Sequence, residues 1–365
     1  MKIRLIIPIV FIIMIIISFP LTASASQLSE EEAEISGQID EIMYSNDISL
    51  SYGEIAGLSF SELWDRIKGA VVSDMNSPIR VLGTILIVSV FTAVMKTLGD
   101  GILHGNSSSE MFDTICAVTA AAAVTPRLLD VYGDTLSSIE RSGGFILVFV
   151  PLFAGITAAV GGIVSGGLYN VLILAASEIL VGLSQNYLMP VLSVSAVLAI
   201  SGSVFPNAST DGIVTLLKKV IVWGMTISMT LFTGFLTLKC SLAGKADGVA
   251  TKTAKFLMSG FVPIVGGAVS DAYSTVRGGF EVMRGTVGTA GIFAVVLIML
   301  PPILRLLIFR GVMWAGTAVA ELLSAQPVVR LLKGLDSGLS IAQSVLICYS
   351  LMFILCTSIL MNISG

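Results

Sequence analysis

Charged residues are scarce in this sequence, and their scarcity excludes a soluble fold. Asp, Glu, Lys and Arg make up 12% of the 365 residues, whereas 55% are hydrophobic. A soluble domain carries about 25% charged residues, which it needs to cover its surface. The apolar runs are long and continuous, whereas a membrane β-barrel would alternate apolar and polar residues in segments of about ten. We therefore predict an all-α, polytopic helical membrane protein.

Histidine and closely spaced cysteines are also nearly absent, which argues against metal and catalytic sites. His104 is the single histidine, and none of the four cysteines stands in CxxC spacing. The chain has no phosphate-binding loop of the Gly-x-x-x-x-Gly-Lys-[Ser/Thr] type, and a Ser/His or His/metal catalytic site would rest entirely on His104. It also lacks a basic stripe with interleaved aromatic residues. We therefore expect no enzyme, cofactor, metal or nucleic-acid partner, and any ATP must be hydrolysed by another chain.

Residues 1–25 have the pattern of a cleavable signal peptide. Lys2 and Arg4 precede an apolar core at Leu5–Phe19, and the sequence ASA at 23–25 offers a small-x-small cleavage site. An uncleaved anchor helix is the alternative. In either case we expect the chain from Gln27 onward to emerge outside the cytoplasm.

Residues 26–78 are predicted to form an acidic segment outside the bilayer. Ten acidic residues precede its first base, Arg66. Apolar residues then recur near helical spacing up to Met75, which predicts an amphipathic helix on or outside the membrane surface. Pro78 interrupts the chain before the first membrane segment.

Residues 79–365 form the predicted transmembrane domain, with about seven to nine membrane segments. A span needs about 20 apolar residues, and seven stretches meet this need: Ile79–Leu98, Gly143–Gly161, Gly166–Leu183, Leu188–Phe205, Ile213–Leu238, Thr286–Leu304 and Leu339–Met361. Three weaker candidates are short enough to be re-entrant or interfacial: Ile115–Val124, Phe256–Val269 and Val312–Leu323.

A lysine-rich segment at 239–255 conflicts with a simple count of crossings. It holds four lysines and one aspartate, so the positive-inside rule predicts a cytoplasmic location. Six crossings from an outer N-terminus would leave it outside. We resolve the conflict by predicting that Ile115–Val124 does not cross fully, which leaves His104, Arg127 and Arg141 in the cytoplasm.

Three lysines of this segment share one side of a predicted helix. Lys245, Lys252 and Lys255 fall within about 80° on a helical wheel of 3.6 residues per turn, opposite a more apolar side. Such a helix suits the inner leaflet of the membrane. An acidic cytoplasmic partner is the alternative.

Glu178 stands near the middle of an otherwise apolar segment. A carboxylate in hydrocarbon is costly and normally faces the bundle or water. On a helical wheel it shares a small, polar side with Gly166, Asn170, Ser177, Gly182 and Gln185. This side is either the lining of a pore that uses Glu178 as a cation or proton site, or a helix interface holding a protonated Glu178.

A stripe of threonines marks a later segment. Its members step by four, three and four residues, and Lys219 precedes them on the same side: Thr226, Thr230, Thr233 and Thr237. The stripe is a candidate channel lining. We favour packing, because such hydroxyls commonly bond to their own helix or to a neighbour.

Two glycine-rich stretches resemble each other and predict broken helices. FVPLFAGITAAVGGIVSGGLYN begins at Phe149, and FVPIVGGAVSDAYSTVRGG begins at Phe261. We predict close backbone approach at Gly162 and Gly166, and helix breaks at the two prolines and the two glycine pairs: Pro151, Pro263, Gly166-Gly167 and Gly278-Gly279. Matching breaks in two halves are typical of transport folds, although chance similarity of glycine-rich segments is the alternative.

The order of these features resembles the stage III sporulation protein AE family of endospore-forming bacteria. The resemblance covers essentially the whole chain and is carried by the leader, the acidic segment, FVPLFAG…GGIVSGG, SGSVFPN at 201–207, the lysine segment, FVPIVGG…DAY and Pro301-Pro302. It implies a multi-pass protein of the mother-cell membrane around the forespore, with no established catalytic residues.

The resemblance further implies a role in a channel or secretion-like complex. The implied partners are other membrane proteins of the complex, a separate cytoplasmic secretion-type ATPase and the lipid bilayer, and we expect a homo-oligomer. The role within the complex would be that of an export gate or permease. The alternative is a self-contained secondary transporter that couples an ion or proton through Glu178.

Overall fold

The structure is a computed structural model that describes residues 37, 40, 41, 44, 69, 75–102, 106–205, 210–261 and 266–362. The predicted signal peptide, nearly all of the acidic segment, and Pro263 lie outside these residues. The described residues are helical apart from short turns, and no strand occurs among them. The all-α prediction is therefore confirmed.

Long helices joined by tight connections account for the described chain. They are α5 (Asn76–Ile102), α6 (Asn106–Ala159), α7 (Ile163–Leu183), the π-helical turn η1 (Ser184–Leu188), α8 (Met189–Val204), α9 (Thr210–Phe261), α10 (Gly266–Leu322) and α11 (Gln326–Asn362). α7, η1 and α8 follow one another without a break and form a single rod.

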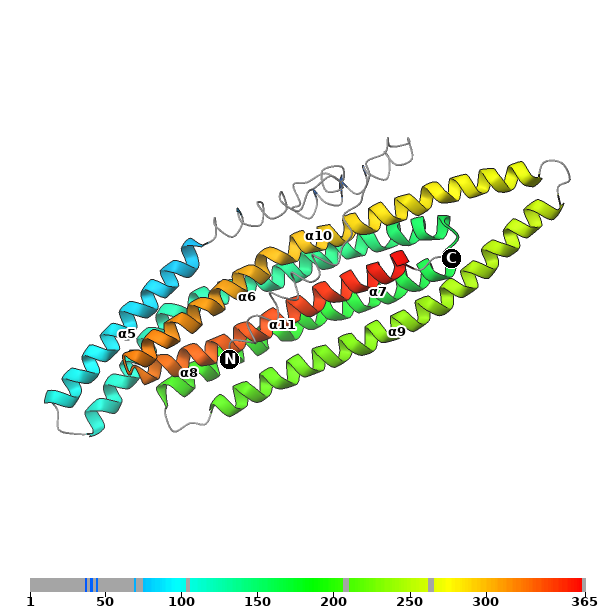
Figure 1. Cartoon of the computed structure of the whole chain (residues 1–365). Helices are drawn as coiled ribbons and strands as arrows, with labels where there is room; N and C mark the ends of the chain where they lie inside the picture. The colour runs from blue at the N-terminus through cyan, green and yellow to red at the C-terminus, as the bar shows by residue number, and fades with distance from the viewer. Residues whose placement is uncertain are drawn as a thin grey trace.

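The helices run back and forth along one axis and form an elongated bundle (Figure 1). We call the end that holds the α6–α7 turn, the end of α9 and the start of α10 the hairpin end. The end that holds the starts of α6, α9 and α11 is the far end. α5 lies only along the far half of the bundle, beside α6 and α10.

The helices are much longer than a bilayer is thick. α6, α9 and α10 have 54, 52 and 57 residues, which corresponds to about 80 Å at 1.5 Å per residue. The hydrocarbon core of a bilayer is about 30 Å thick. Six helical stretches are long and apolar enough to cross a membrane, but the five that have 37–50 residues cannot lie in it over their whole length.

The core is built around α11 and a stack of aromatic rings on α6. Phe145, Phe149 and Phe153 recur every four residues, and successive ring centroids lie 5.3 and 5.6 Å apart. Phe353 of α11 meets Phe149 edge-on at 5.8 Å. α10 reaches the stack at Gly291, where an added Cβ would lie 2.0 Å from Phe149 Cζ. The close packing of α6, α10 and α11 therefore depends on a residue without a side chain.

α9 differs from the other helices because it lies at the edge of the bundle. Only 6% of its most apolar window is buried, against 33–56% for the other five candidate spans. It nevertheless contacts α7, α8, α10 and α11 along one side. Its outer side carries large apolar residues at helical spacing, including Leu216, Val220, Trp223, Ile227 and Leu231.

The predicted helix breaks at Pro151, Gly166-Gly167 and Gly278-Gly279 are wrong. Pro151 lies inside α6, and the two glycine pairs lie inside α7 and α10. A proline removes one backbone hydrogen bond, and packing against neighbouring helices keeps α6 helical around it. The turn of the first stretch lies instead at Gly161 and Gly162.

Several predicted segments merge into longer helices. Gly166–Leu183 and Leu188–Phe205 belong to the α7–η1–α8 rod, so they are not two antiparallel crossings joined by a turn. Ile115–Val124 is part of α6, and Val312–Leu323 falls largely on the last turns of α10. Phe256–Val269 includes the end of α9 and the start of α10. Along α6 and the α7–η1–α8 rod, polar residues lowered the hydropathy without interrupting the helix.

Candidate functional site

The α6–α7 turn is a tight hairpin that requires glycine at two positions. Gly161 has φ +100°, a conformation that L side chains rarely adopt. An added Cβ at Gly162 would lie 2.9 Å from Thr157 Cγ2 and 3.0 Å from its carbonyl oxygen. At Gly166 the added Cβ would lie 2.8 Å from the carbonyl oxygen of Ala154. The backbones of α6 and α7 therefore lie in direct contact at Gly162 and Gly166.

The start of α7 has no capping side chain of its own. Its N-cap residue is Gly162, which cannot accept hydrogen bonds from the first free backbone N–H groups as Ser, Thr, Asp or Asn would. A helix end that is buried in this way needs acceptors from elsewhere in the fold.

Asp247 of α9 supplies those acceptors. Its Oδ1 accepts a hydrogen bond from the backbone N of Val164 at 2.9 Å, and its Oδ2 accepts one from the backbone N of Ser165 at 2.9 Å. The hydroxyl of Ser165 donates to the same Oδ2 at 2.6 Å. The carboxylate is 2% exposed, and its negative charge lies at the positive end of the α7 dipole. Asp247 thus joins α9 to the hairpin.

A second contact one turn further along α9 closes this junction. Thr251 is buried, and its Oγ1 would lie 2.9 Å from a Cβ added at Gly161. Arg277 of α10 also approaches this glycine, with its Cζ 4.0 Å from the added Cβ. The hairpin, α9 and α10 therefore meet at one point, which we call the hairpin junction.

The polar side predicted around Glu178 is divided between several environments. Ser177 is buried, and its Oγ lies 2.9 Å from Tyr349 Oη of α11. Glu178 is exposed and makes no hydrogen bond or ion pair with another described residue. Asn170 is partly buried, with Oδ1 unbonded, and Gln185 donates to Glu140 of α6 at 3.2 Å. The side predicted as polar is thus partly buried and partly exposed.

Most of the threonine stripe bonds to its own helix. Thr226, Thr230 and Thr237 donate to backbone oxygens four residues earlier, at 2.7–2.8 Å. Thr233 is the exception, because its buried Oγ1 has no partner among the described atoms. Lys219 lies exposed on the same helix. The stripe occupies a flank of α9 between its bundle side and its apolar outer side.

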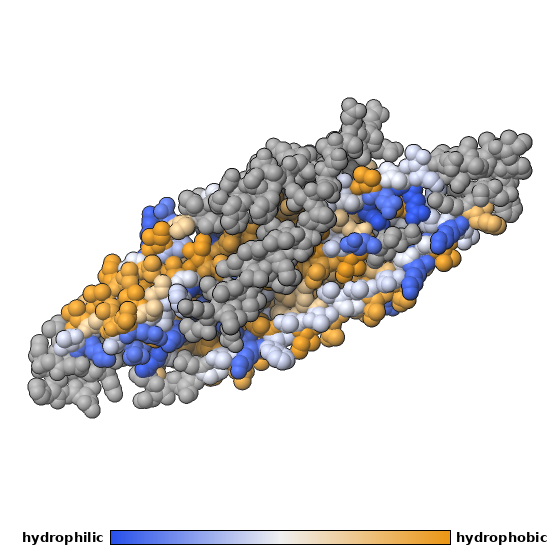
Figure 2. Space-filling model, in the orientation of Figure 1, coloured by the Kyte–Doolittle hydropathy of each residue, from blue (hydrophilic) through white to orange (hydrophobic). Residues whose placement is uncertain are grey.

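Two of the three singled-out lysines lie on the surface near the hairpin end. Lys245 and Lys252 are exposed on α9, whereas the side chain of Lys255 lies outside the described set. Figure 2 shows hydrophilic groups near both ends of the visible strip of α9, with paler and hydrophobic groups between them. Asp247 points the other way, into the bundle.

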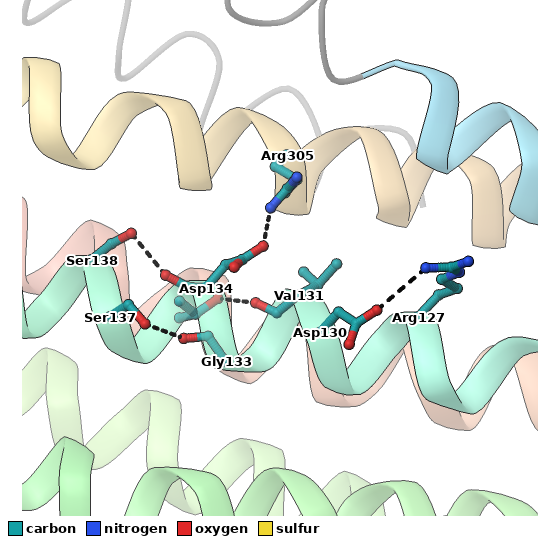
Figure 3. Close-up of polar contacts among 9 residues, drawn as sticks. Arg127, Asp130, Val131, Gly133, Asp134, Ser137, Ser138 and Arg305 are labelled. Carbon is teal, nitrogen blue, oxygen red and sulfur yellow. Dashed lines mark hydrogen bonds and ion pairs between the residues drawn. The ribbon is translucent and has the colours of Figure 1, made fainter.

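Ion pairs cross the bundle near its middle and in the far half. Arg305 of α10 pairs with Asp134 of α6, and the two side chains point toward each other across the gap between their helices (Figure 3). Arg310 of α10 lies 2.9 Å from Asp336 of α11 and also donates to the buried Gln343. Arg310 is 12% exposed in its side chain. These bridges connect α6, α10 and α11 between the apolar stretches.

The hairpin junction and the bridging ion pairs were not predicted from the sequence. Asp247 stood out there only as one acid among four lysines, and its bonding partners lie 82 and 83 residues earlier. The sequence signal that could have predicted the junction was a helix start without a capping side chain, at Gly162, together with a single aspartate, Asp247, in another helix rich in small residues. The ion pairs could have been predicted from the acidic and basic residues that stand within apolar stretches of different helices.

Cysteine and metal chemistry receive no support from the described residues. Cys116, Cys240 and Cys356 are buried and Cys348 is partly buried, and all four are free thiols. No group of three His, Cys, Asp or Glu side chains within the described ranges could hold a metal ion.

Comparison with known proteins places the chain in a family. A model described as "Stage III sporulation protein AE (spore_III_AE)" matches residues 46–364. The chain is similar to "Stage III sporulation protein AE" of Bacillus subtilis (strain 168), with 24% identity over 283 residues, covering 78% of this chain and 71% of that protein. No solved structure matches. Because the family model spans nearly all of the transmembrane bundle, the chain belongs to the stage III sporulation protein AE family.

Proposed function

We propose that this protein is a non-enzymatic, multi-pass component of a channel or secretion-like complex between the mother cell and the forespore. Within that complex it would act as an export-gate or permease-like part in the mother-cell membrane. The observation that carries the proposal is a bundle with six apolar helical stretches, each long enough to span a bilayer, in a member of a sporulation family. Other membrane proteins and a cytoplasmic secretion-type ATPase would complete the apparatus.

Two features of the bundle support a role for this protein as one part of a larger complex. The polar residues predicted along α7 lie in different environments, since Ser177 is buried and Glu178 is exposed. α9 leaves nearly all of its apolar window open to lipid or to another chain. A pore between copies, or between this chain and other proteins, fits this distribution better than a pore within one chain.

A self-contained transporter is the second candidate, and one observation favours it. Glu178 is an exposed carboxylate in the middle of an apolar helix, and such residues commonly mark ion or proton pathways. If Glu178 carries the coupling charge, Glu178→Gln should abolish function, because glutamine keeps the size and hydrogen bonding but not the charge. As part of a gate, the chain should tolerate Gln, and the yield of heat-resistant spores should stay within about twofold of the parent.

Affinity purification from sporulating cells tests the assembly. The tagged full-length chain is extracted in mild detergent, and co-purifying proteins are identified. We expect a secretion-type ATPase and other membrane proteins of the complex, recovered equally with Glu178→Gln. Recovery of the chain alone, under conditions that preserve another membrane complex, would contradict the proposal and favour the transporter.

A further inference from the structure

On the long helices, basic residues flank uncharged stretches of similar length. On α9, Lys219 and Lys239 enclose residues 220–238 without a charged residue. The 20-residue step between them corresponds to about 30 Å. On α10, Arg284 and Arg305 enclose residues 285–304, and their separation is about 32 Å. Both distances match the hydrocarbon core of a bilayer.

The other helices continue the same band. On α6 no charged residue follows Arg141 up to the turn at Gly161, a distance of about 30 Å. On α11 none follows Asp336 up to the end of the helix. Glu178 of α7 is the one charged side chain of this half that lies between these limits.

Contacts at the hairpin junction place these stretches beside one another. Thr251 of α9 and Arg277 of α10 both adjoin Gly161. Along the axis of α10, the uncharged stretch begins about 10 Å from Arg277 and ends about 42 Å from it. Along the axis of α9, it begins about 18 Å from Thr251 and ends about 48 Å from it. Shifts of this size between helices are those of a bundle tilted in the membrane.

The far half of the bundle is a poor candidate for the bilayer. Four ion pairs between described residues lie from the middle of the bundle into this half, at Arg127–Asp130, Arg305–Asp134, Arg310–Asp336 and Lys333–Glu321. The uncharged stretch of α6 in this half runs only from 114 to 126, about 20 Å. α5 has exposed apolar residues such as Ile87, yet Arg80 and Lys96 enclose only about 24 Å there.

We propose that the bilayer crosses only the hairpin half of the bundle. The membrane then contains the second part of α6, α7, the middle of α9, the first apolar part of α10 and the end of α11, which makes five crossings. α5, the first part of α6, α8, the end of α10 and the start of α11 stand outside the bilayer on one side. The lysine-bearing end of α9 stands on the opposite side.

Five crossings also remove the conflict over the lysine segment. With the predicted outer N-terminus, three crossings lead to the end of α9 and place Lys245 and Lys252 in the cytoplasm, as the positive-inside rule requires. The same arrangement places Arg127 and Arg141 outside, opposite to the expectation from the sequence. Of the six crossings counted from the sequence, Ile79–Leu98, Ile115–Val124 and Leu188–Phe205 are removed, and the three that remain restore the parity.

Single-cysteine labelling with a membrane-impermeant maleimide tests the proposal. The full-length chain, with its four cysteines changed to alanine, is reconstituted in sealed proteoliposomes and carries Ile87→Cys, Ile227→Cys or Val249→Cys. All three side chains are well exposed in the bundle, at 72%, 49% and 66%, so protection reports lipid. Reaction of each variant after solubilisation in denaturing detergent is the control.

We expect Ile87→Cys and Val249→Cys to react from opposite faces of the membrane and Ile227→Cys to be protected at least tenfold. Lys333→Cys, at a polar position in the far half, should react from the same face as Ile87→Cys. Protection of Ile87→Cys, reaction of Ile227→Cys, or labelling of Ile87→Cys and Val249→Cys from one face would each overturn the proposal.

Discussion

A single carboxylate, Asp247, holds the start of α7 to α9, and its removal should be costly. Asp247→Ala would leave the backbone N–H group of Ser165 without an acceptor in a buried site, and that of Val164 without one in a partly buried site. An orphaned buried donor costs about 1–3 kcal/mol, and a lost cap costs about 1 kcal/mol. We expect the free energy of unfolding to fall by roughly 2–4 kcal/mol, measured by reversible unfolding in mixed micelles.

The matched control for Asp247 is Val249→Ala on the same helix, because Val249 is 66% exposed. Asp247→Asn should fall between the two, since one oxygen remains while an NH₂ group faces a backbone donor. Equal stability of Asp247→Ala and Val249→Ala would contradict the capping role.

Two adjacent glycines give a second comparison at the residue scale. Gly166→Ala would place a Cβ 2.8 Å from the carbonyl oxygen of Ala154, whereas Gly167→Ala would meet nothing within 4 Å. Overpacking costs about 1–3 kcal/mol, and an open helical glycine gains up to about 1 kcal/mol on change to alanine. We expect the thermal midpoint in detergent to fall for Gly166→Ala and to hold or rise for Gly167→Ala; the reverse order would refute the close contact.

Single residues also show what the sequence could and could not predict. Wheel positions identified Ser177 and Glu178 as neighbours on α7, but not that one is buried against Tyr349 and the other exposed. Helical periodicity places residues on a side of a helix, and only the packing decides what that side meets. Asp247 escaped prediction for the same reason, because its partners come from a distant part of the chain.

At the scale of elements, α10 and α11 are joined by two ion pairs that differ in burial. Arg310–Asp336 has side-chain exposures of 12% and 33%, and Lys333–Glu321 has 59% and 50%. Exposed pairs are typically worth about 0–1 kcal/mol, whereas hydrogen bonds to charged groups in less exposed sites are worth about 1.5–3 kcal/mol. Double-mutant cycles to alanine should give a coupling free energy at least about twice as large for Arg310–Asp336.

The two ion pairs serve as controls for each other because they join the same two helices. A larger coupling for Lys333–Glu321 would show that the pairing between α10 and α11 depends on something other than burial of Arg310.

The sequence predicted correctly that these segments are helical, but it did not predict where each helix begins and ends. Continuous apolar runs identified helices throughout, and the described chain is helical where they lie. The seven stretches nevertheless fall on six rods, because polar residues such as Gln185 and Asn186 lowered the hydropathy between Gly166–Leu183 and Leu188–Phe205. A π-helical turn carries the backbone through those residues without a reversal.

For the whole molecule, helix length matters more than the number of helices. A bundle of rods about 80 Å long must place much of its length outside a bilayer about 30 Å thick. A protein of this form can fix a membrane segment and an extramembrane segment relative to each other without a hinge. That property suits a component of a larger apparatus, in keeping with the proposed function.

The most direct test of this account is a distance along the α7–η1–α8 rod. Spin labels at Ile163→Cys and Phe205→Cys, both exposed positions, are measured by double electron–electron resonance in the cysteine-free chain in lipid nanodiscs. A continuous rod predicts a separation of roughly 60 Å. Two antiparallel crossings would bring the labels to within about 20 Å, since neighbouring helix axes lie only 8–10 Å apart, and that result would contradict a bundle longer than the membrane is thick.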